Sequence, residues 1–405
     1  MDQLKVYAGK IREWMNAHRQ ELVDFTMEMM RIESTTYHEG EAVAWLKAKM
    51  EEFGFDEVRV DSAGNLIGRA GSGPCIVLAD AHIDTVEPGD PKDWGFDPLD
   101  PRIIDGHIWG RGIVDDKGCL AALVFAGRAL KQLALDHAAT LWVSSSIAEE
   151  DVEGSCVRAM MEEFSDIQPH MILVAEASGN RIIRGHKGRA LISMEVTGKA
   201  AHASAAWRGE NALIKSLPLM QAVDDLKDLP EDPVLGKGTI EVTNVDCDTP
   251  SLNTIPGKVT ITADRRISCG ESREALINEL KPFLDGCGAK AWIDVEQITT
   301  YTGKTIEQED FFPSWILPED HPVIQSACSG YQAVRGESPS VGTWDFCTNA
   351  CYLCGITGIP SVGFGPGDEG LCHSTEERLS IQELTDAASV YASVVLSYAL
   401  QGKDA

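Results

Sequence analysis

The first and last thirds of the chain alternate short, continuous apolar runs with segments whose apolar residues recur every three or four positions. Such runs are typical of strands buried on both faces, and the periodic segments are typical of amphipathic helices. Strands are predicted at residues 75–79, 140–147, 171–175 and 361–367 (the last ending in a glycine-rich loop), a hairpin at 103–110, and helices at 11–52 (two helices), 119–133 and 380–400. This alternation predicts an α/β fold with parallel strands.

The pattern changes after Gly188, where polar and apolar residues alternate along the strands. Such alternation is typical of strands with only one buried face. In chain order, strand, helix, strand, strand, helix and strand are predicted at residues 190–198, 211–226, 238–245, 257–265, 272–283 and 290–297. This β-α-β-β-α-β order predicts an antiparallel sheet covered by two helices. We therefore expect an inserted domain, residues 188–300, between two parts of a first domain, residues 1–187 and 301–405.

Side chains of the metal-ligand type follow the predicted buried strands. They are His82 and Asp84, then Asp115 and Asp116, then Glu149 and Glu150, and finally Glu176. In open α/β sheets, ligands bind beyond the carboxyl ends of the strands, where these residues fall. So many carboxylates can converge only if a cation compensates their charge. If they converge, they predict a metal-dependent hydrolase.

Each cluster also has an ordinary structural interpretation. A single histidine at a strand end is usually a hydrogen-bonded residue without a catalytic role. A Glu-Glu pair is usually a solvated first turn of a helix, and Asp-Asp-Lys-Gly is usually a turn with a helix cap. The order of the clusters and their common place at strand ends favour one shared site.

Composition narrows the function classes. The formal net charge of −28 disfavours nucleic acid and anionic membranes as partners, because both attract basic surfaces. No apolar run approaches the roughly 20 residues of a membrane-spanning helix. The charged N-terminal segment does not have the pattern of a secretory signal, and the 11 cysteines form an odd, scattered set. Together these features predict a cytoplasmic protein with free thiols.

The motifs resemble those of the M20 family of dinuclear zinc peptidases and amidohydrolases, over almost the whole chain. They are HIDTV (82–86), GRGIVDDKG (110–118), EEDVEG (149–154), EAS (176–178), GKAAHAS (198–204), RGENA (208–212) and GFGPGDEGLCH (363–373). Within the family the chain is most similar to the group of selenium-metabolism-linked hydrolases. The resemblance implies a mixed sheet with helices on both faces and an inserted domain that serves as lid and dimerisation surface.

The resemblance also implies the metal ligands. His82, Asp115 and Glu176 would bind one ion, and Asp115, Glu150 and His373 would bind the other, with Asp115 as the bridge. Nitrogen and oxygen ligands of this kind suit Zn²⁺, with Co²⁺ or Mn²⁺ as possible replacements. Two divalent metal ions per subunit are therefore expected.

Further roles follow from the same resemblance. Glu149 would be the general base, and Asp84 would orient the His82 ring. His202 would reach the site of a partner subunit in a homodimer. Arg266, with Asn253 beside it, would hold a substrate carboxylate, although Arg266 could equally be a sheet residue paired with a neighbouring acid.

The predicted substrate is a small, carboxylate-bearing amide: a dipeptide, an N-acyl amino acid or an N-carbamoyl amino acid. The competing hypothesis is a non-catalytic metal-binding or metabolite-binding protein with the same fold. Glu149 favours the enzyme, because a site that only holds metal has no use for this second carboxylate.

Three departures from the family pattern bear on substrate choice. Ala148 stands where the family often has Asp, Asn349 replaces Asp in a frequent Thr-Asp-Ala segment, and Ala177 stands where many members have Pro. None of these changes removes a predicted metal ligand.

Cys347, Cys351 and Cys354 have the spacing of a radical-SAM iron–sulfur site. The favoured alternative is a small-residue helix or loop packed in the core, where a free cysteine behaves as a small hydrophobic residue.

Overall fold

The predicted buried strands form the centre of a nine-stranded sheet in the computed structural model, which describes residues 2–401. The sheet order is β1 (Glu57–Val60), β2 (Leu66–Ala70), β6 (Ala139–Ser146), β3 (Cys75–His82), β7 (Met171–Ala175), β22 (Ser361–Phe364), β8 (Ile182–His186) and β20 (Trp315–Ile316), with β21 (Val341–Trp344) also paired to β8. Strands β6, β3, β7 and β22 are parallel to one another, and β21 is parallel to β8, whereas the pairs β1–β2, β2–β6, β22–β8 and β8–β20 are antiparallel. The mixed α/β sheet is confirmed.

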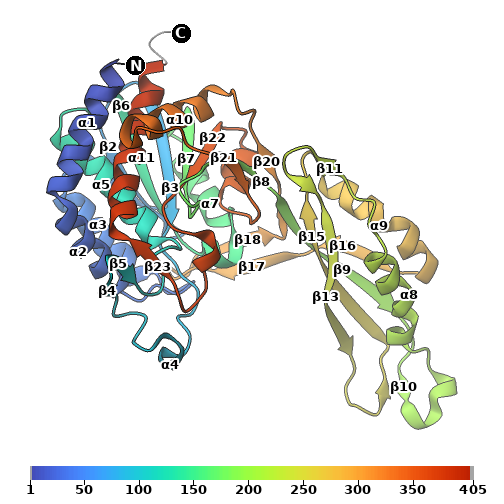
Figure 1. The fold of residues 1–405 in the computed structure, drawn as a ribbon. Helices are drawn as coiled ribbons and strands as arrows, with labels where there is room; N and C mark the ends of the chain where they lie inside the picture. The colour runs from blue at the N-terminus through green and yellow to red at the C-terminus, as the bar shows by residue number, and fades with distance from the viewer. Residues whose placement is uncertain (1, 402–405) are drawn as a thin grey trace.

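Alternate residues of β3 pack on opposite faces of the sheet. Val77 and Ala79 belong to the main apolar core, whereas Leu78 belongs to a second core with residues of α7 (Ser155–Glu163). The main core is completed by α1 (Asp2–Ala17), α2 (Arg19–Met30), α3 (Gly40–Glu52), α5 (Lys117–Gln132), α10 (Pro322–Arg335) and α11 (Ile381–Gln401). Helices therefore cover both faces (Figure 1).

Residues 11–52 form parts of three helices, so the prediction of two helices was wrong. α1 ends at Ala17, and α2 begins at Arg19 after the single residue His18. The break between α2 and α3 has a tertiary cause that periodicity does not record, because Thr35 bridges Thr85 beside the end of β3. The segment around Thr35 is thereby drawn to the carboxyl edge of the sheet.

The alternating segments form a separate five-stranded antiparallel sheet with its own apolar core. Its strands are β13 (Thr239–Asp248), β15 (Lys258–Ile267), β9 (Gly188–Thr197), β16 (Lys290–Ile293) and β19 (Phe311–Phe312), and its helices are α8 (Ala212–Asp224) and α9 (Arg273–Cys287). The predicted β-α-β-β-α-β order is confirmed. Figure 1 shows this smaller unit projecting from the larger one, with both helices on one side of its sheet.

The predicted single strand at residues 290–297 was wrong. β16 ends at Ile293, and β17 (Val295–Thr299) leaves the small sheet to pair with β18 (Thr305–Glu309). Asp294 stands at the break and accepts hydrogen bonds from Ser193 and Trp292. The β17–β18 ribbon returns the chain to the larger unit (Figure 1).

The predicted hairpin at residues 103–110 is confirmed. β4 (Arg102–Ile104) pairs with β5 (His107–Trp109), and both turn residues have a positive φ, 48° at Asp105 and 76° at Gly106. β23 (Arg378–Ser380) adds a third strand. The remaining short elements are α4 (Pro91–Trp94), α6 (Glu149–Val152), β10 (Ala201–His202), β11 (Glu231–Asp232), β12 (Gly236–Lys237), β14 (Thr254–Ile255), and single turns at Ala203–Arg208, Cys351–Ile356 and Glu369–Leu371.

The cysteine segment packs as a small-residue helix. Residues Cys351–Ile356 form a helical turn, and Cys347, Cys351 and Cys354 are buried free thiols. Within residues 2–401, the three sulfur atoms do not belong to a converging group of metal ligands. Across the same residues, no helix has the length and apolar character needed to cross a membrane.

Candidate metal centre

Adjacent parallel strands deliver the predicted ligands to one edge of the large sheet. His82 is the last residue of β3 and lies opposite Ser146, the last residue of β6. Glu149 and Glu150 follow β6 after a two-residue turn, and Glu176 directly follows β7. Since β6, β3 and β7 are neighbours, the strand order alone brings these side chains together.

Asp115 lies between two imidazoles. Its Oδ1 is 2.9 Å from Nε2 of His82, and its Oδ2 is 3.1 Å from Nε2 of His373. Nε2 of His373 is also 2.9 Å from Oε2 of Glu150, and Nε2 of His82 is 3.9 Å from Oε1 of Glu176. The Asp115 carboxylate therefore joins His82, which lies near Glu176, to His373, which lies near Glu150.

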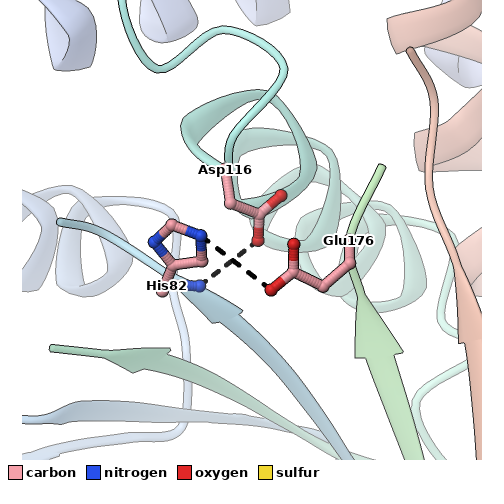
Figure 2. Close-up of side chains that lie close together, drawn as sticks. All are labelled: His82, Asp116 and Glu176. Carbon is pink, nitrogen blue, oxygen red and sulfur yellow. Dashed lines mark hydrogen bonds and ion pairs between the residues drawn. The ribbon is translucent and has the colours of Figure 1, made fainter. Parts of the chain in front are cut away.

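Asp116 is a site residue that the sequence reasoning did not assign. Figure 2 shows its carboxylate and that of Glu176 directed toward His82. Oδ2 of Asp116 accepts a hydrogen bond from the backbone N–H of His82 at 3.2 Å. Its buried Oδ1 has no partner among residues 2–401. Donor atoms of His82, Asp116 and Glu176 lie within 4.8 Å of one another, as do those of His82, Asp115 and Glu150.

The ring of His82 is oriented from behind by Asp84. Nδ1 of His82 is 2.9 Å from the backbone carbonyl oxygen of Asp84 and 3.5 Å from its Oδ1. Because a carbonyl oxygen can only accept, Nδ1 carries the proton, and in a neutral ring the lone pair is on Nε2. Nε2 is the atom that faces the carboxylates.

The Asp84 carboxylate also fixes the turn that carries the glutamate pair. Its oxygens accept the backbone N–H groups of Glu149 at 3.1 Å and Glu150 at 3.3 Å, and the hydroxyl of Thr36 at 3.0 Å. Asp84 thereby positions both the first imidazole and the turn after β6, a wider role than the ring orientation predicted from the resemblance.

Burial of so many carboxylates disfavours their charged forms. The pKa of Glu149 is raised well above its usual value by burial and by the charge of Glu176. Burial likewise raises the pKa of Glu176, to which the charge of Asp116 adds. A cation placed among these groups would remove that cost. Carboxylates grouped around His82, with His373 beside Asp115 and Glu150, fit divalent metal ions.

Glu377 holds the loop that presents Asp115, and no sequence motif indicated this role. Its buried carboxylate accepts backbone N–H groups from Gly112 at 3.1 Å, Val114 at 2.9 Å and Asp115 at 3.3 Å, and it pairs with Arg111 at 2.7 Å. Glu377 follows His373 by four residues, so one short segment supplies both a candidate ligand and the support for another.

Two departures from the family pattern have local explanations. Ala148 has a φ of 51°, and Glu39 accepts its backbone N–H at 3.1 Å, which fixes the start of the glutamate turn. Asn349 donates from Nδ2 to Asp80 at 2.9 Å while its Oδ1 accepts the N–H of Gly154 at 2.8 Å. An aspartate at position 349 would lack this donor and would face the buried Asp80 carboxylate.

The site opens into a cavity of about 350 Å³, a size suited to a small ligand. Its wall includes candidate ligands, two arginines of the neighbouring sheet and several other side chains: Asp115, Glu149, Glu150, Glu153, Glu176, Arg189, Arg266, Phe346, Cys347, Glu369, Cys372 and His373. The structure thus places Arg266 on the wall, as a substrate-binding role requires. The cavity has a carboxylate-rich end and an arginine-bearing end.

His202 and Asn253 are close to each other but do not line this cavity in the described part of the chain. Nε2 of His202 is 3.4 Å from Nδ2 of Asn253, and both residues are exposed. They lie on and beside the β10–β14 pair, at the far end of the smaller unit (Figure 1). The role predicted for His202 therefore requires the metal centre of a second subunit to lie close to this end of the smaller unit.

Metal loading should release protons. Hydrogen bonds to Asp115 and Glu150 raise the pKa of His373 to about 10, so this ring is protonated at neutral pH before a cation displaces the proton. The apparent affinity for Zn²⁺ should rise about tenfold per pH unit for each proton released, between about pH 6 and 8. Calorimetric titration in buffers of different ionisation enthalpy measures the number of protons released when the metal binds. A Zn²⁺ affinity that is independent of pH would contradict proton release from His373.

Comparison with known proteins agrees with this geometry. Residues 78–397 match the model of peptidase family M20/M25/M40. The uncharacterized protein YgeY of Escherichia coli (strain K12) is 34% identical over 391 residues, which cover 96% of this chain and 97% of that protein. Succinyl-diaminopimelate desuccinylase 2 of Ruegeria sp. (strain TM1040) is 26% identical over 397 residues, with 94% and 96% covered.

A solved structure shows the same fold. It is the YXEP protein of Bacillus subtilis, described as a dinuclear metal binding peptidase from the M20 family. It matches with a TM-score of 0.66 at 14% identity and covers 94% of this chain and 98% of that one. The chain therefore belongs to peptidase family M20/M25/M40 and is a hydrolase that acts on carbon–nitrogen bonds.

Proposed function

We propose that the protein hydrolyses the amide bond of a small, carboxylate-bearing substrate: a dipeptide, an N-acyl amino acid or an N-carbamoyl amino acid. The observation that carries the proposal is the shared cavity. Candidate metal ligands, the buried carboxylate of Glu149 and the guanidinium of Arg266 line one space of about 350 Å³. A metal-storage or sensing site would need neither Glu149 nor Arg266 there.

Two ions, zinc by preference, would be held by the two donor groups that share Asp115. His82, Asp115 and Glu176 would hold one, and Asp115, Glu150 and His373 the other. The distances of 2.9 and 3.1 Å from the Asp115 oxygens to the two imidazoles support this division. When bound, the ions would polarise the scissile carbonyl and increase the acidity of the attacking water.

Glu149 is the proton carrier in this proposal. It takes a proton from the attacking water and delivers it to the nitrogen of the leaving amine. Asp84 holds the Glu149 backbone, and burial keeps the pKa of the Glu149 carboxyl above its usual value, which favours proton uptake. Arg266 holds the substrate carboxylate, since its guanidinium is on the cavity wall and Asp264 steadies it at 2.8 Å.

The test is a hydrolysis screen of metal-reconstituted protein against dipeptides, N-acyl amino acids and N-carbamoyl amino acids, with amine release as the readout. The proposal expects turnover in one of the three classes and none after chelation. Metal-loaded protein that binds two ions per chain but hydrolyses no member of the panel would instead support the non-catalytic binding protein.

We also propose that residues 1–187 and 301–405 act as the catalytic domain and that residues 188–300 mediate a homodimer. Large apolar side chains are exposed near His202 and on the neighbouring α8: Trp207 is 78% exposed, Leu252 106%, Ile214 60% and Leu217 50%. Exposed apolar side chains gathered in one region are typical of interaction surfaces.

Trp207→Asp should therefore shift the protein toward monomer in light scattering and lower turnover, because His202 could then no longer reach a second site. The matched control is Val6→Asp, which changes a 56% exposed apolar residue of α1 in the larger unit. A monomeric wild-type protein with full activity would contradict the role assigned to His202.

A further inference from the structure

Arg189 is a second arginine at the substrate end of the cavity, and nothing in the sequence motifs pointed to it. It lies on β9 and lines the same cavity as Arg266 on β15. The two residues are direct cross-strand partners in the antiparallel pair β9–β15. Partners of this kind project to the same face of a sheet, with Cα atoms about 4.5–5.5 Å apart. The register therefore presents two guanidiniums side by side.

Like charges directly opposite each other destabilise a sheet, so this pair needs compensation. Nη2 of Arg189 is 3.1 Å from Oε2 of Glu153, and Nε of Arg266 is 2.8 Å from Oδ1 of Asp264. The guanidinium of Arg189 also stacks over the ring of Phe312, 4.8 Å from its centroid. These contacts hold Arg189 in place at the wall.

Glu153 is the acidic partner of Arg189 on the cavity wall. It follows Glu150 by three residues in the EEDVEG segment, and it lines the cavity beside both arginines. Burial raises the pKa of Glu153 to about 7, although Arg189 and Arg266 both favour its charged form. The carboxylate is thus an internal partner of Arg189 that carries a substantial burial cost, and an anionic ligand could replace it.

We propose that Arg189 is a second anion anchor and that the amine part of the substrate is a dicarboxylic amino acid. In this arrangement, which rests on the proposed function, Arg266 holds the α-carboxylate and Arg189 holds the second acidic group in place of Glu153. Guanidinium forks match planar carboxylates in bidentate geometry, so two adjacent forks suit two carboxylates on one short substrate.

A cationic substrate group beside Glu153 is the opposite arrangement, and the charges disfavour it. Such a group would lie against two guanidiniums, and the Glu153 oxygen nearest to them is already bound by Arg189. An acidic group instead gains the contact with Arg189 and ends the pairing of the buried Glu153 carboxylate with that guanidinium.

The kinetic test compares substrates that differ only in the second acidic group. N-acyl glutamate is compared with N-acyl glutamine, and aspartate with asparagine, using the acyl, carbamoyl or aminoacyl group that the screen finds active. We expect kcat/KM to be about 10- to 100-fold higher for the acids, the size of one charge-assisted interaction. Arg189→Met should remove most of this preference, whereas Arg266→Met should lower kcat/KM for both members of each pair.

Arg273→Met is the matched control. Arg273 is also an arginine of the smaller unit that stacks on a phenylalanine, with its guanidinium 5.2 Å from the centroid of Phe311, but it does not line the cavity that holds the candidate metal ligands. Arg273→Met should leave the ratio of kcat/KM for the acid substrate to kcat/KM for the amide substrate at the wild-type value. Arg189→Lys should retain part of the preference, and Glu153→Gln should raise the affinity for the acids because the competing carboxylate is gone.

A binding measurement separates this inference from the proposed function. Calorimetry of metal-loaded protein with L-glutamate and with L-glutamine should show at least about tenfold tighter binding of glutamate, lost in Arg189→Met. If this preference is found but no amide is hydrolysed, the proposed function fails and the anchor stands. If amides are hydrolysed without any acid preference, the anchor is overturned and the function stands. An equal loss for both ligands in Arg189→Met would also overturn it.

Discussion

Glu149→Gln should lower kcat by roughly 10²- to 10⁴-fold, the usual contribution of a general acid–base group, and leave the metal content unchanged. Glutamine keeps the shape of the side chain but cannot accept the proton of the attacking water. The backbone contact to Asp84 that positions this residue does not depend on its side chain. Single-turnover kinetics and elemental analysis of the same preparation measure the two quantities.

Asp151→Asn provides the matched control for this variant. Asp151 is in the same helical turn, α6, but it is exposed and lies outside the cavity lining. It should keep most of the activity. A Glu149→Gln enzyme with more than about a tenth of the wild-type kcat would remove Glu149 from the proton-transfer step, since a group of this kind contributes at least about 10²-fold.

Asp115→Ala should remove both metal ions and all measurable turnover, because each of its oxygens lies beside a different imidazole. His373→Ala should be less severe for metal content and leave about one ion per chain, because it affects only one of the two donor groups. Inductively coupled plasma mass spectrometry after gel filtration gives the ion count directly.

Glu376→Gln changes an exposed acid three residues after His373 in the sequence and should keep both ions. Two ions retained in Asp115→Ala would mean that the carboxylate of Asp116 takes the shared position. In that outcome, the ligand shared by the two ions would be Asp116 and not Asp115, and the fold around the site would be unchanged.

The sequence predicted the centre of the large sheet well because burial on both faces leaves continuous apolar runs. The run at residues 75–79 became β3, and its register with β6 and β7 put His82, Glu150 and Glu176 at one edge. The hairpin β1–β2 and the ribbon β17–β18 were missed because their strands are only four or five residues long, and in β1, β17 and β18 charged or polar residues interrupt the apolar ones.

The supporting contacts of the site could not be read from the sequence. More than 260 residues separate Glu377 from residues 112–115 in the sequence, and no local pattern predicts a contact over that separation. The Arg189–Arg266 pair depends on one register between β9 and β15, and a slip of one residue would turn either side chain to the other face. By contrast, the candidate metal ligands could be predicted from the sequence, because each stands at a strand end or in a short motif.

The two ends of the cavity belong to different units of the fold. The candidate metal ligands come from the large sheet and its loops. Arg189 and Arg266 come from two adjacent strands of the small sheet, β9 and β15. The reach from the reacting bond to the anion anchors is therefore set by the angle at which the units meet. If the two arginines anchor the substrate as proposed, we expect the protein to select substrates by length as well as by charge. Substitutions in the β17–β18 ribbon, which joins the two units, should then change the preferred length without touching the ligand.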